Sequence, residues 1–469
     1  MFGELHEECG VFAVYNHPQA SHLTYYGLHS LQHRGQEGTG IISGDEGELN
    51  LHKGEGLVSE IYNDHVLQHL AGRNAIGHVR YATAGGAGYN NVQPLLFQRF
   101  TGSDLGIAHN GNIVNAHELK CHLEQQGSIF QATSDTEILA HLLFRGQGTM
   151  IQRLCESLQL LEGAFAFVIL HGDTLYVARD RHGLRPLSIG MLNGAYIFAS
   201  ETCALDIVGA TFIRDVLPGE VITVNHEGLN SVAYAQQTTH AMCSMEYIYF
   251  SRPDSDIEGI NVHRARRNTG HILAAESPVE ADIVIGVPDS SISAAIGYSE
   301  VSGIPYEIGL VKNRYIGRTF IQPTQELREQ GVKMKLSAVR SIVAGKRVIM
   351  IDDSIVRGTT SKRIVRMLKE AGATEVHVRI AAPAIKYPCF YGVDMSTFDE
   401  LISSRLDETQ LATYIEADSL AFISLAGLLR GIGRSGNLGK NCGQCTACFN
   451  GDFPTNLYES YDAANREKK

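Results

Sequence analysis

Residues 348–360 read VIMIDDSIVRGTT and are the most informative stretch of this 469-residue chain. The leading apolar residues are typical of a buried β-strand, and Asp352 and Asp353 stand where that strand would end. Ligands of open α/β sheets bind beyond the carboxyl ends of the strands. The Gly-Thr-Thr turn that follows offers backbone N–H groups and a positive helix end to a phosphate. An acidic helix cap with a Thr-rich turn would be the plain alternative, but it leaves the adjacent acids unexplained.

The segments around this stretch alternate between expected strands and helices, as in an α/β fold with a parallel sheet. Strands are expected at 283–287, 347–351 and 375–380, and helices at 291–298 and 361–371. A strand, loop, helix and strand in this order form a right-handed parallel crossover. A helical region is expected at about 401–429, before a tail rich in glycine and cysteine.

The first half of the chain lacks that regular alternation of strands and helices, which predicts an α+β fold with antiparallel strands. Strands are expected at 10–15, 75–81, 105–109, 164–170 and 175–178, and helices at 22–33, 136–143 and 151–161. A polar stretch, 236–240, resembles a linker between the two halves. The length also favours at least two domains.

Composition narrows the functional class. Apolar residues make up 44% of the chain and charged residues 19%, as in folded globular proteins. The net charge of -12 argues against a general nucleic-acid or anionic-membrane surface, so a phosphate site must be local. No apolar run approaches the roughly 18 residues of a membrane helix. Residues 1–8 contain neither a basic nor an apolar region of the kind that begins a secretion signal, so a cytoplasmic protein is expected.

Cys9 stands directly before the first expected strand. If residues 1–8 were removed, its own α-amino group, with a pKa near 8, could act as the base for its thiol. A small buried residue at the start of a strand is the plain alternative, and for Cys9 alone it would be preferred.

Polar residues follow several of the expected elements and favour a catalytic role for Cys9 over a structural one. Asn110 and Gly111 can supply one side-chain and one backbone N–H to an oxyanion. Arg80 suits a substrate carboxylate, and Asp135, at a likely helix start, suits an ammonium group. Taken singly, these are a tight turn, a surface ion pair and a helix cap.

Together these motifs resemble the glutaminase domain of the N-terminal-nucleophile amidotransferases. Cys-Gly-Val-Phe, His-Arg-Gly-Gln-Glu, His-Val-Arg-Tyr-Ala-Thr, His-Asn-Gly-Asn and Ser-Asp-Thr-Glu occur in the order of that family. The resemblance implies a four-layer αββα sandwich. It also implies that Cys9 is the nucleophile, that Arg80 and Asp135 hold glutamine, and that Asn110 and Gly111 form the oxyanion hole.

The stretch 348–360 resembles the phosphoribosyl pyrophosphate loop of the type I phosphoribosyltransferases. A basic segment at 312–319 is expected to be a lid over the pyrophosphate that excludes water. The expected substrate contacts are Asp352, Asp353, Ser354, Arg357, Gly358, Thr359, Thr360, Lys312 and Arg318. One Mg²⁺ per subunit is expected at Ser290, Asp352 and Asp353, because Mg²⁺ takes one or two carboxylates plus substrate oxygens.

One chain with both domains resembles the glutamine phosphoribosylpyrophosphate amidotransferases, the first enzymes of purine synthesis. The resemblance implies ammonia transfer from glutamine to phosphoribosyl pyrophosphate, feedback inhibition by purine nucleotides, and a homotetramer or homodimer. The expected parts are a propeptide (1–8), a glutaminase domain (9–235), a phosphoribosyltransferase domain (243–435) and a tail (436–469). Two alternatives stay open: a glutaminase that feeds a sugar phosphate, and a non-catalytic nucleotide-sensing regulator.

Nine cysteines in a chain without a secretion signal suggest catalysis or metal binding. By spacing alone, a zinc site competes with an iron-sulfur cluster. The iron-sulfur subgroup of the family implies one 4Fe–4S cluster per subunit at Cys243, Cys389, Cys445 and Cys448. Cys442 is a fifth nearby thiol and leaves the last pair open. The other three thiols are expected to be buried apolar residues: Cys121, Cys155 and Cys203.

Overall fold

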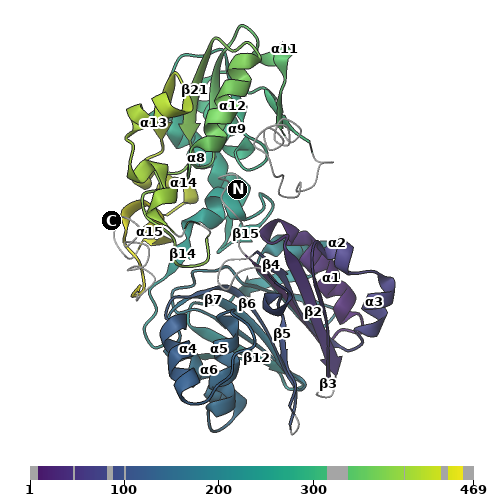
Figure 1. Cartoon of the computed structure of the whole chain (residues 1–469). Helices are drawn as coiled ribbons and strands as arrows, with labels where there is room; N and C mark the ends of the chain where they lie inside the picture. Colours follow the sequence, from purple (N-terminus) through teal and green to yellow (C-terminus); the bar gives the residue numbers. More distant parts are fainter. Residues whose placement is uncertain are drawn as a thin grey trace.

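The computed structural model describes residues 9–45, 48–81, 88–99, 102–313, 336–393, 395, 397–434 and 442–457. The chain forms two lobes, the first half of the sequence in one and the second half in the other (Figure 1). None of the helices in these ranges is both long and apolar enough to span a membrane.

The first lobe contains a seven-stranded antiparallel sheet among its described residues. Its order is β11 (Thr211–Asp215), β9 (Ser188–Leu192), β10 (Ala195–Ala199), β1 (Gly10–Tyr15), β4 (Asn74–Arg80), β2 (Gly38–Asp45) and β3 (Glu48–Glu55). Along β1, side chains alternate between the two faces of the sheet. Phe12 and Val14 pack under the helices α1 (Ala20–Ser30), α2 (Val58–Ile61), α3 (Asp64–His69) and α7 (Thr202–Ile207).

A second antiparallel sheet lies against the other face of the first. Its order is β13 (Gly228–Ala233), β12 (Glu220–Asn225), β8 (Thr174–Arg179), β7 (Gly163–His171), β6 (Leu105–Ile113) and β5 (Leu95–Phe97). Val11 and Ala13 of β1 share a core with Ala108 of β6 and Val168 of β7. The outer face packs on α5 (Thr136–Arg145) and α6 (Met150–Leu160), with α4 (Ala116–Gln125) beside them. The four-layer αββα sandwich expected from the sequence is confirmed.

The second lobe is built on a parallel sheet, in the order β17 (Ile283–Gly286), β20 (Arg347–Asp352), β21 (Glu375–Ile380) and β22 (Ser419–Phe422). Its core includes side chains from α8 (Val262–Glu276), α9 (Ile292–Ser302), α12 (Thr359–Glu370), α13 (Glu408–Ile415) and α14 (Leu425–Ile432). Gly270 lets α8 approach α9 closely, because a Cβ there would lie 2.0 Å from the Ala294 carbonyl oxygen. The α/β prediction for this half is confirmed.

Short elements join the two lobes and carry several cysteines. The strands β14 (Ala241–Cys243) and β23 (Gly443–Cys445) pair in parallel, and they place Cys243 beside Cys445. Helix α15 (Ala447–Asn450) follows, and the Cys448 carbonyl accepts hydrogen bonds from the backbone N–H groups of Lys386 and Tyr387. The end of the chain is thus tied to the loop that carries Cys389.

Three expectations from the sequence need correction. The helical region at 401–429 is interrupted by the strand β22, since α13 ends at Glu416 in a left-handed conformation. The strand expected at 105–109 continues to Ile113. Finally, Cys121 and Cys155 are half-buried rather than buried; only Cys203 of that group lies in the core.

Candidate functional site

Cys9 lies directly before β1, buried at the edge of the first sheet. Its thiol donates to the Tyr81 carbonyl oxygen at 3.5 Å. Burial raises the pKa of this thiol to about 11, while the nearby Arg80 lowers it and Asp135 raises it. The two predicted glutamine ligands therefore lie close enough to Cys9 to act on its charge. At neutral pH the thiol needs a base to become a nucleophile.

Asn110 and Gly111 lie inside β6, not in a turn after it, and pair with Ala166 and Phe165 of β7. The Asn110 side chain is fully buried, and neither its oxygen nor its nitrogen has a hydrogen-bond partner among the described residues. Gly111 has φ +145°, and a Cβ there would lie 2.0 Å from the Ala164 carbonyl oxygen. An unpaired buried amide is costly, so its persistence points to a transient partner.

Arg80 and Asp135 are both buried, at the end of β4 and at the start of α5. Burial alone would raise the pKa of Asp135, but His109, the Ile113 N–H and Lys120 lower it below its ordinary value. The Ile113 N–H donates to the Asp135 carboxylate at 2.8 Å. Asp135 is therefore an ionised acceptor at neutral pH, as a partner for an ammonium group must be.

The second predicted site lies at the carboxyl end of β20. The hydroxyl of Ser290 donates to the Asp353 carboxylate, and Ser354 donates to the same carboxylate at 2.7 Å. Ser291, which the sequence did not single out, donates to Asp352 at 3.3 Å. Burial raises the pKa of Asp353, and the contacts from Ser290, Ser354 and Arg266 oppose that rise.

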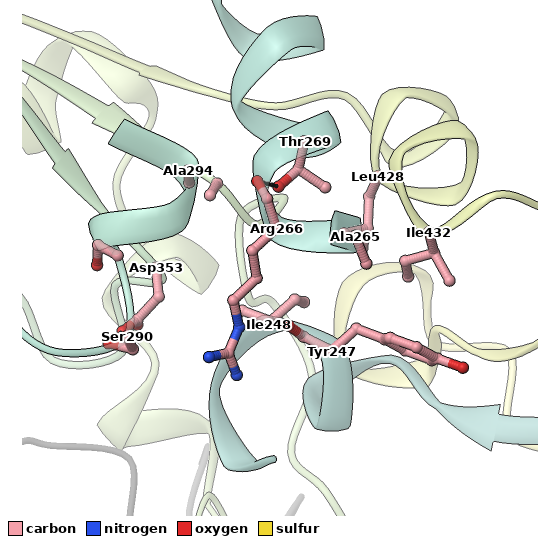
Figure 2. A pocket seen from close by; sticks show the side chains of 12 residues that line it. Tyr247, Ile248, Ala265, Arg266, Thr269, Ser290, Ala294, Asp353, Leu428 and Ile432 are labelled. Atoms are coloured by element: carbon pink, nitrogen blue, oxygen red, sulfur yellow. Dashed lines mark hydrogen bonds between the residues drawn. The ribbon is translucent and has the colours of Figure 1, made fainter. Parts of the chain in front are cut away.

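A pocket next to these acids is lined by residues from α8, α9 and α14 (Figure 2). Arg266 extends from α8 into it, toward Ser290 and Asp353. Burial lowers the pKa of Arg266 to about 10, against the opposing charge of Asp353. Arg266 is therefore a cation at neutral pH, in a pocket where a phosphate-bearing ligand is expected.

The remaining loop residues are placed as follows. Gly358 has φ +74° and caps α12, whose first residues are Thr359 and Thr360. Arg357 pairs with Glu400 at 2.6 Å. Lys312 ends β18 (Leu310–Lys312), which pairs with β19 (Leu336–Ala338), and lies 3.3 Å from the Asp289 carboxylate. Arg318 and most of the expected lid lie outside the described residues.

Four cysteines gather where the two lobes meet. Burial, with a smaller contribution from Cys389, raises the pKa of Cys243 to about 11. Burial also raises the pKa values of Cys445 and Cys448 well above the ordinary value, and both respond to Cys243 and Cys389. Cys442 instead donates to the Gln444 carbonyl oxygen at 3.2 Å. No group of three or more His, Cys, Asp or Glu side chains in the described ranges is arranged to hold a metal ion.

Two buried arginines near the candidate sites were not predicted as functional residues from the sequence. Arg34 stood in the recognised His-Arg-Gly-Gln motif without an assigned role, although its side chain is fully buried near Cys9. Arg266 stands in the sequence His-Arg-Ala-Arg-Arg at 263–267. Such a basic cluster in an acidic chain could have indicated an anion site.

Both lobes match known families. Residues 78–206 match the glutamine amidotransferase domain and residues 263–387 the phosphoribosyl transferase domain. The molecule is thus a glutamine amidotransferase joined to a phosphoribosyltransferase. It is 61% identical to the amidophosphoribosyltransferase of Bacillus subtilis (strain 168), over 97% of this chain and 96% of that protein. It is 54% identical to that of Staphylococcus aureus (strain MRSA252), over 98% of this chain and 94% of that protein. The chain belongs to the amidophosphoribosyltransferase family.

Solved structures agree with this assignment. The B. subtilis glutamine phosphoribosylpyrophosphate amidotransferase complexed with ADP and GMP has a TM-score of 0.91 at 60% identity, over 96% of this chain and 98% of that one. A structure described as the allosteric regulatory enzyme of purine biosynthesis has a TM-score of 0.92 at 61% identity, over 96% of this chain and 97% of that one.

Proposed function

We propose that this chain transfers the amide nitrogen of glutamine to phosphoribosyl pyrophosphate, giving 5-phospho-β-ribosylamine, glutamate and pyrophosphate, in the first step of purine synthesis. The observation that carries the proposal is the convergence of Cys9, Arg80 and Asp135 in one lobe, in a chain whose other lobe has the phosphoribosyltransferase loop. Because both sites are kept, an enzyme is favoured over a nucleotide-sensing regulator.

In the glutamine half-reaction, Cys9 attacks the amide carbon. A thiol whose pKa is about 11 is almost wholly protonated at neutral pH, so it needs a base. Removal of residues 1–8 would free the α-amino group of Cys9, with a pKa near 8, for that task. Arg80 holds the substrate carboxylate and Asp135 its ammonium group. The Asn110 amide and the Gly111 N–H stabilise the oxyanion. The C–N bond then breaks, the protonated α-amino group gives its proton to the leaving nitrogen, and ammonia departs. Water hydrolyses the remaining thioester to glutamate and the free Cys9 thiol.

In the phosphoribosyl half-reaction, ammonia attacks carbon 1 of the ribose and pyrophosphate leaves. Asp352 and Asp353 bind the ribose hydroxyls. The N-terminal turn of α12 and Gly358 present backbone N–H groups to the 5-phosphate. Lys312 and Arg318 would bind the pyrophosphate, with the positive charge of Arg266 nearby, and the lid would exclude water that competes with ammonia.

The acids also fit a Mg²⁺ ion. Mg²⁺ is usually held by one or two carboxylates plus substrate phosphates rather than by a full protein cage. Two buried carboxylates with Ser290 beside them match that pattern, and they do not amount to a three-residue metal site by themselves. A bound Mg²⁺ would neutralise charge on the pyrophosphate.

The gathered cysteines fit a 4Fe–4S cluster better than a single ion. Each cysteine of such a cluster binds a different iron, so the thiolates lie farther apart than around zinc. Cys389 raises the pKa values of Cys243, Cys445 and Cys448, so the four thiols lie near one another. The cluster would tie the tail to both lobes.

We also propose regulation by purine nucleotides and assembly into an oligomer. The B. subtilis relative was solved with ADP and GMP, which supports purine nucleotides as inhibitors of this chain. A dimer or tetramer is supported by exposed apolar side chains on and beside α7 and β11, which are Ile207, Phe212, Ile213 and Leu217. The expected domain limits, 9–235 and 243–435, stay predictions; β13 ends before the first boundary and β14 begins after it.

The test compares the mature wild-type protein with Cys9→Ala. Intact mass should show a chain that begins at Cys9. Cys9→Ala should abolish pyrophosphate release with glutamine but retain it with high ammonia. If both activities disappear while the fold is intact, Cys9 serves the structure instead. If glutamine still supports turnover, the nucleophile lies elsewhere.

A further inference from the structure

Arg34 is a fully buried arginine that touches the residue of the nucleophile. It lies at the end of the short helix η1 (Gln32–Arg34), and its Nε donates to the Cys9 carbonyl oxygen at 3.1 Å. The adjacent Gly35 lies against the backbone of Arg80, where a Cβ would come within 2.5 Å of the Arg80 carbonyl carbon. This short segment therefore contacts both the nucleophile and a glutamine ligand.

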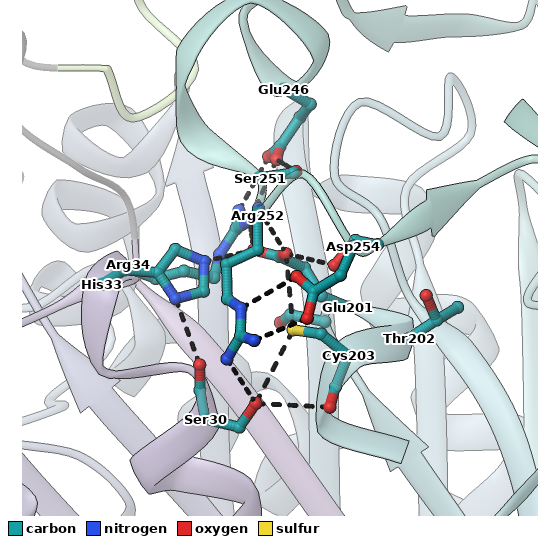
Figure 3. A network of polar contacts seen from close by, with 12 residues as sticks. Ser30, His33, Arg34, Glu201, Thr202, Cys203, Glu246, Ser251, Arg252 and Asp254 are labelled. Atoms are coloured by element: carbon teal, nitrogen blue, oxygen red, sulfur yellow. Dashed lines mark hydrogen bonds and ion pairs between the residues drawn. The ribbon is translucent and has the colours of Figure 1, made fainter. Parts of the chain in front are cut away.

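Two buried glutamates from different lobes hold the guanidinium of Arg34 (Figure 3). Glu201, from the first lobe, accepts from Nη1 at 2.7 Å. Glu246, from the start of the second lobe, accepts from Nη1 at 2.9 Å and from Nη2 at 2.7 Å. All three side chains are fully excluded from solvent. The bidentate pair fixes the direction of the guanidinium as well as its charge.

Glu246 is itself held by the second lobe. It opens a helical turn, η3 (Glu246–Phe250), and accepts from the Ser251 hydroxyl at 2.6 Å. Arg266 stabilises the same turn, since it donates to the carbonyl oxygens of Tyr247 and Ser251 at 2.7 and 2.8 Å. Arg266 also faces Asp353 of the phosphoribosyl loop (Figure 2). Polar contacts thus run from Cys9 through Arg34 and Glu246 to the turn that Arg266 holds, and Asp353 of the second site acts on Arg266 through its charge.

The free-energy cost of burying these charged side chains indicates that they do more than join the two lobes. Burying charges costs free energy, and apolar residues of similar size often stabilise a protein as well or better. The guanidinium that these ion pairs hold also donates a hydrogen bond to the Cys9 carbonyl oxygen. This arrangement sets the position of the Cys9 backbone, which apolar packing would not do. A misplacement of about 1 Å can cost about a hundredfold in rate.

We propose that Arg34 and Glu246 are positioning residues for Cys9, through which the turn at the start of the second lobe holds the glutamine nucleophile in its reactive place. The proposal rests on the proposed function of Cys9. Loosening Glu246 releases the guanidinium from one side and lets the Cys9 carbonyl move.

The test replaces Glu246 by glutamine in the full-length mature protein. This change keeps the shape but removes the charge-assisted bidentate pair. The matched control is Glu300→Gln, which breaks an ion pair with Arg267 at the surface of the second lobe. Cys9 reactivity is measured as the rate of alkylation by a diazoketone analogue of glutamine, across pH. Ammonia-dependent pyrophosphate release measures the second site.

Positioning and electrostatics predict opposite changes. Removing a negative charge near Cys9 favours its thiolate, so a purely electrostatic role would speed alkylation at neutral pH. Positioning predicts that the plateau rate at high pH falls about tenfold to a hundredfold. This fall should exceed any fall in ammonia-dependent turnover by about tenfold, and Glu300→Gln should behave like the wild type.

The possible results separate the two proposals. A wild-type protein that is not alkylated at Cys9 overturns the proposed function. A reactive wild type with an unchanged plateau in Glu246→Gln overturns the positioning role alone. If Glu246→Gln does not fold, Ser251→Ala decides, because it removes only the hydroxyl that steadies Glu246. A plateau lowered about threefold or more supports positioning, and an unchanged plateau refutes it.

Discussion

Replacing Asn110 by leucine separates what this side chain contributes to catalysis from what it costs the fold. The two residues have similar size, so the change removes the amide without opening a large cavity. Removing one oxyanion donor typically lowers kcat about 10²- to 10³-fold, which is about 2.7–4 kcal/mol. We expect a loss of this size in glutamine-dependent turnover, with ammonia-dependent turnover retained.

The expected effect on stability has the opposite sign. The buried Asn110 amide has no partner for its oxygen or nitrogen among the described residues. Such an unsatisfied group costs about 1–3 kcal/mol, and an apolar group of the same shape removes that cost. The free energy of unfolding of the first lobe should rise by up to this amount. The melting temperature should then rise by about 2–4 °C per kcal/mol.

Asn112, two residues along the same strand, provides the matched control. Its side-chain nitrogen donates to the Phe390 carbonyl oxygen at 3.0 Å, so Asn112→Leu breaks a hydrogen bond that is made. This variant should lose about 1–3 kcal/mol of stability. Steady-state kinetics with glutamine or ammonia, together with thermal unfolding, measure both effects. If Asn110→Leu keeps kcat within threefold, or melts several degrees lower than the wild type, the oxyanion assignment fails.

Three further predictions follow from the same geometry. Gly111→Ala should abolish glutamine use, because a Cβ would lie 2.0 Å from the Ala164 carbonyl oxygen at φ +145°, while ammonia-dependent pyrophosphate release persists; equal kinetics with both donors would contradict this. Asp353→Asn should lower kcat/KM for phosphoribosyl pyrophosphate about tenfold to a hundredfold, with Cys9 still alkylated at the wild-type rate. Burial alone would raise the pKa of Glu201, but His33 and Arg34 hold it below its ordinary value of 4.5. The stability that Glu201 provides is therefore complete above that pH and is lost as the pH falls below it, so melting temperatures of Glu201→Gln should depend less on pH in the acid range than those of the wild type.

Local patterns predicted the parts of the fold that local physics determines. The expected strands at 10–15 and 375–380 agree with β1 and β21, because both are apolar runs bounded by polar residues. The acidic loop was found for the same reason, since Asp352 and Asp353 directly follow their strand. The short β22 was missed because its sequence, Ser-Leu-Ala-Phe, is too brief to show a strand period between two helices.

Contacts between distant residues could not be predicted in this way. The sequence suggested a turn at Asn110 and Gly111, whereas the partner strand β7 extends β6 through both. Arg34 and Glu246 are separated by 212 positions, and no spacing rule connects them. The gathering of Cys243 and Cys389 with the tail was implied by the family resemblance, and spacing alone left it open.

Several contacts between distant residues lie at the junction of the two lobes, where they fix the orientation of one lobe relative to the other. Arg185 of the first lobe lies 3.7 Å from Glu246 and donates to the Tyr391 carbonyl, while Asn112 donates to the neighbouring Phe390. An apolar interface could slide at little cost, but hydrogen bonds and buried ion pairs have defined directions and tolerate little displacement. The loop that carries Cys389 is therefore held in one orientation beside β6. Two half-reactions that share an ammonia molecule need this fixed geometry between their sites, which explains why the junction is built from charged and backbone groups.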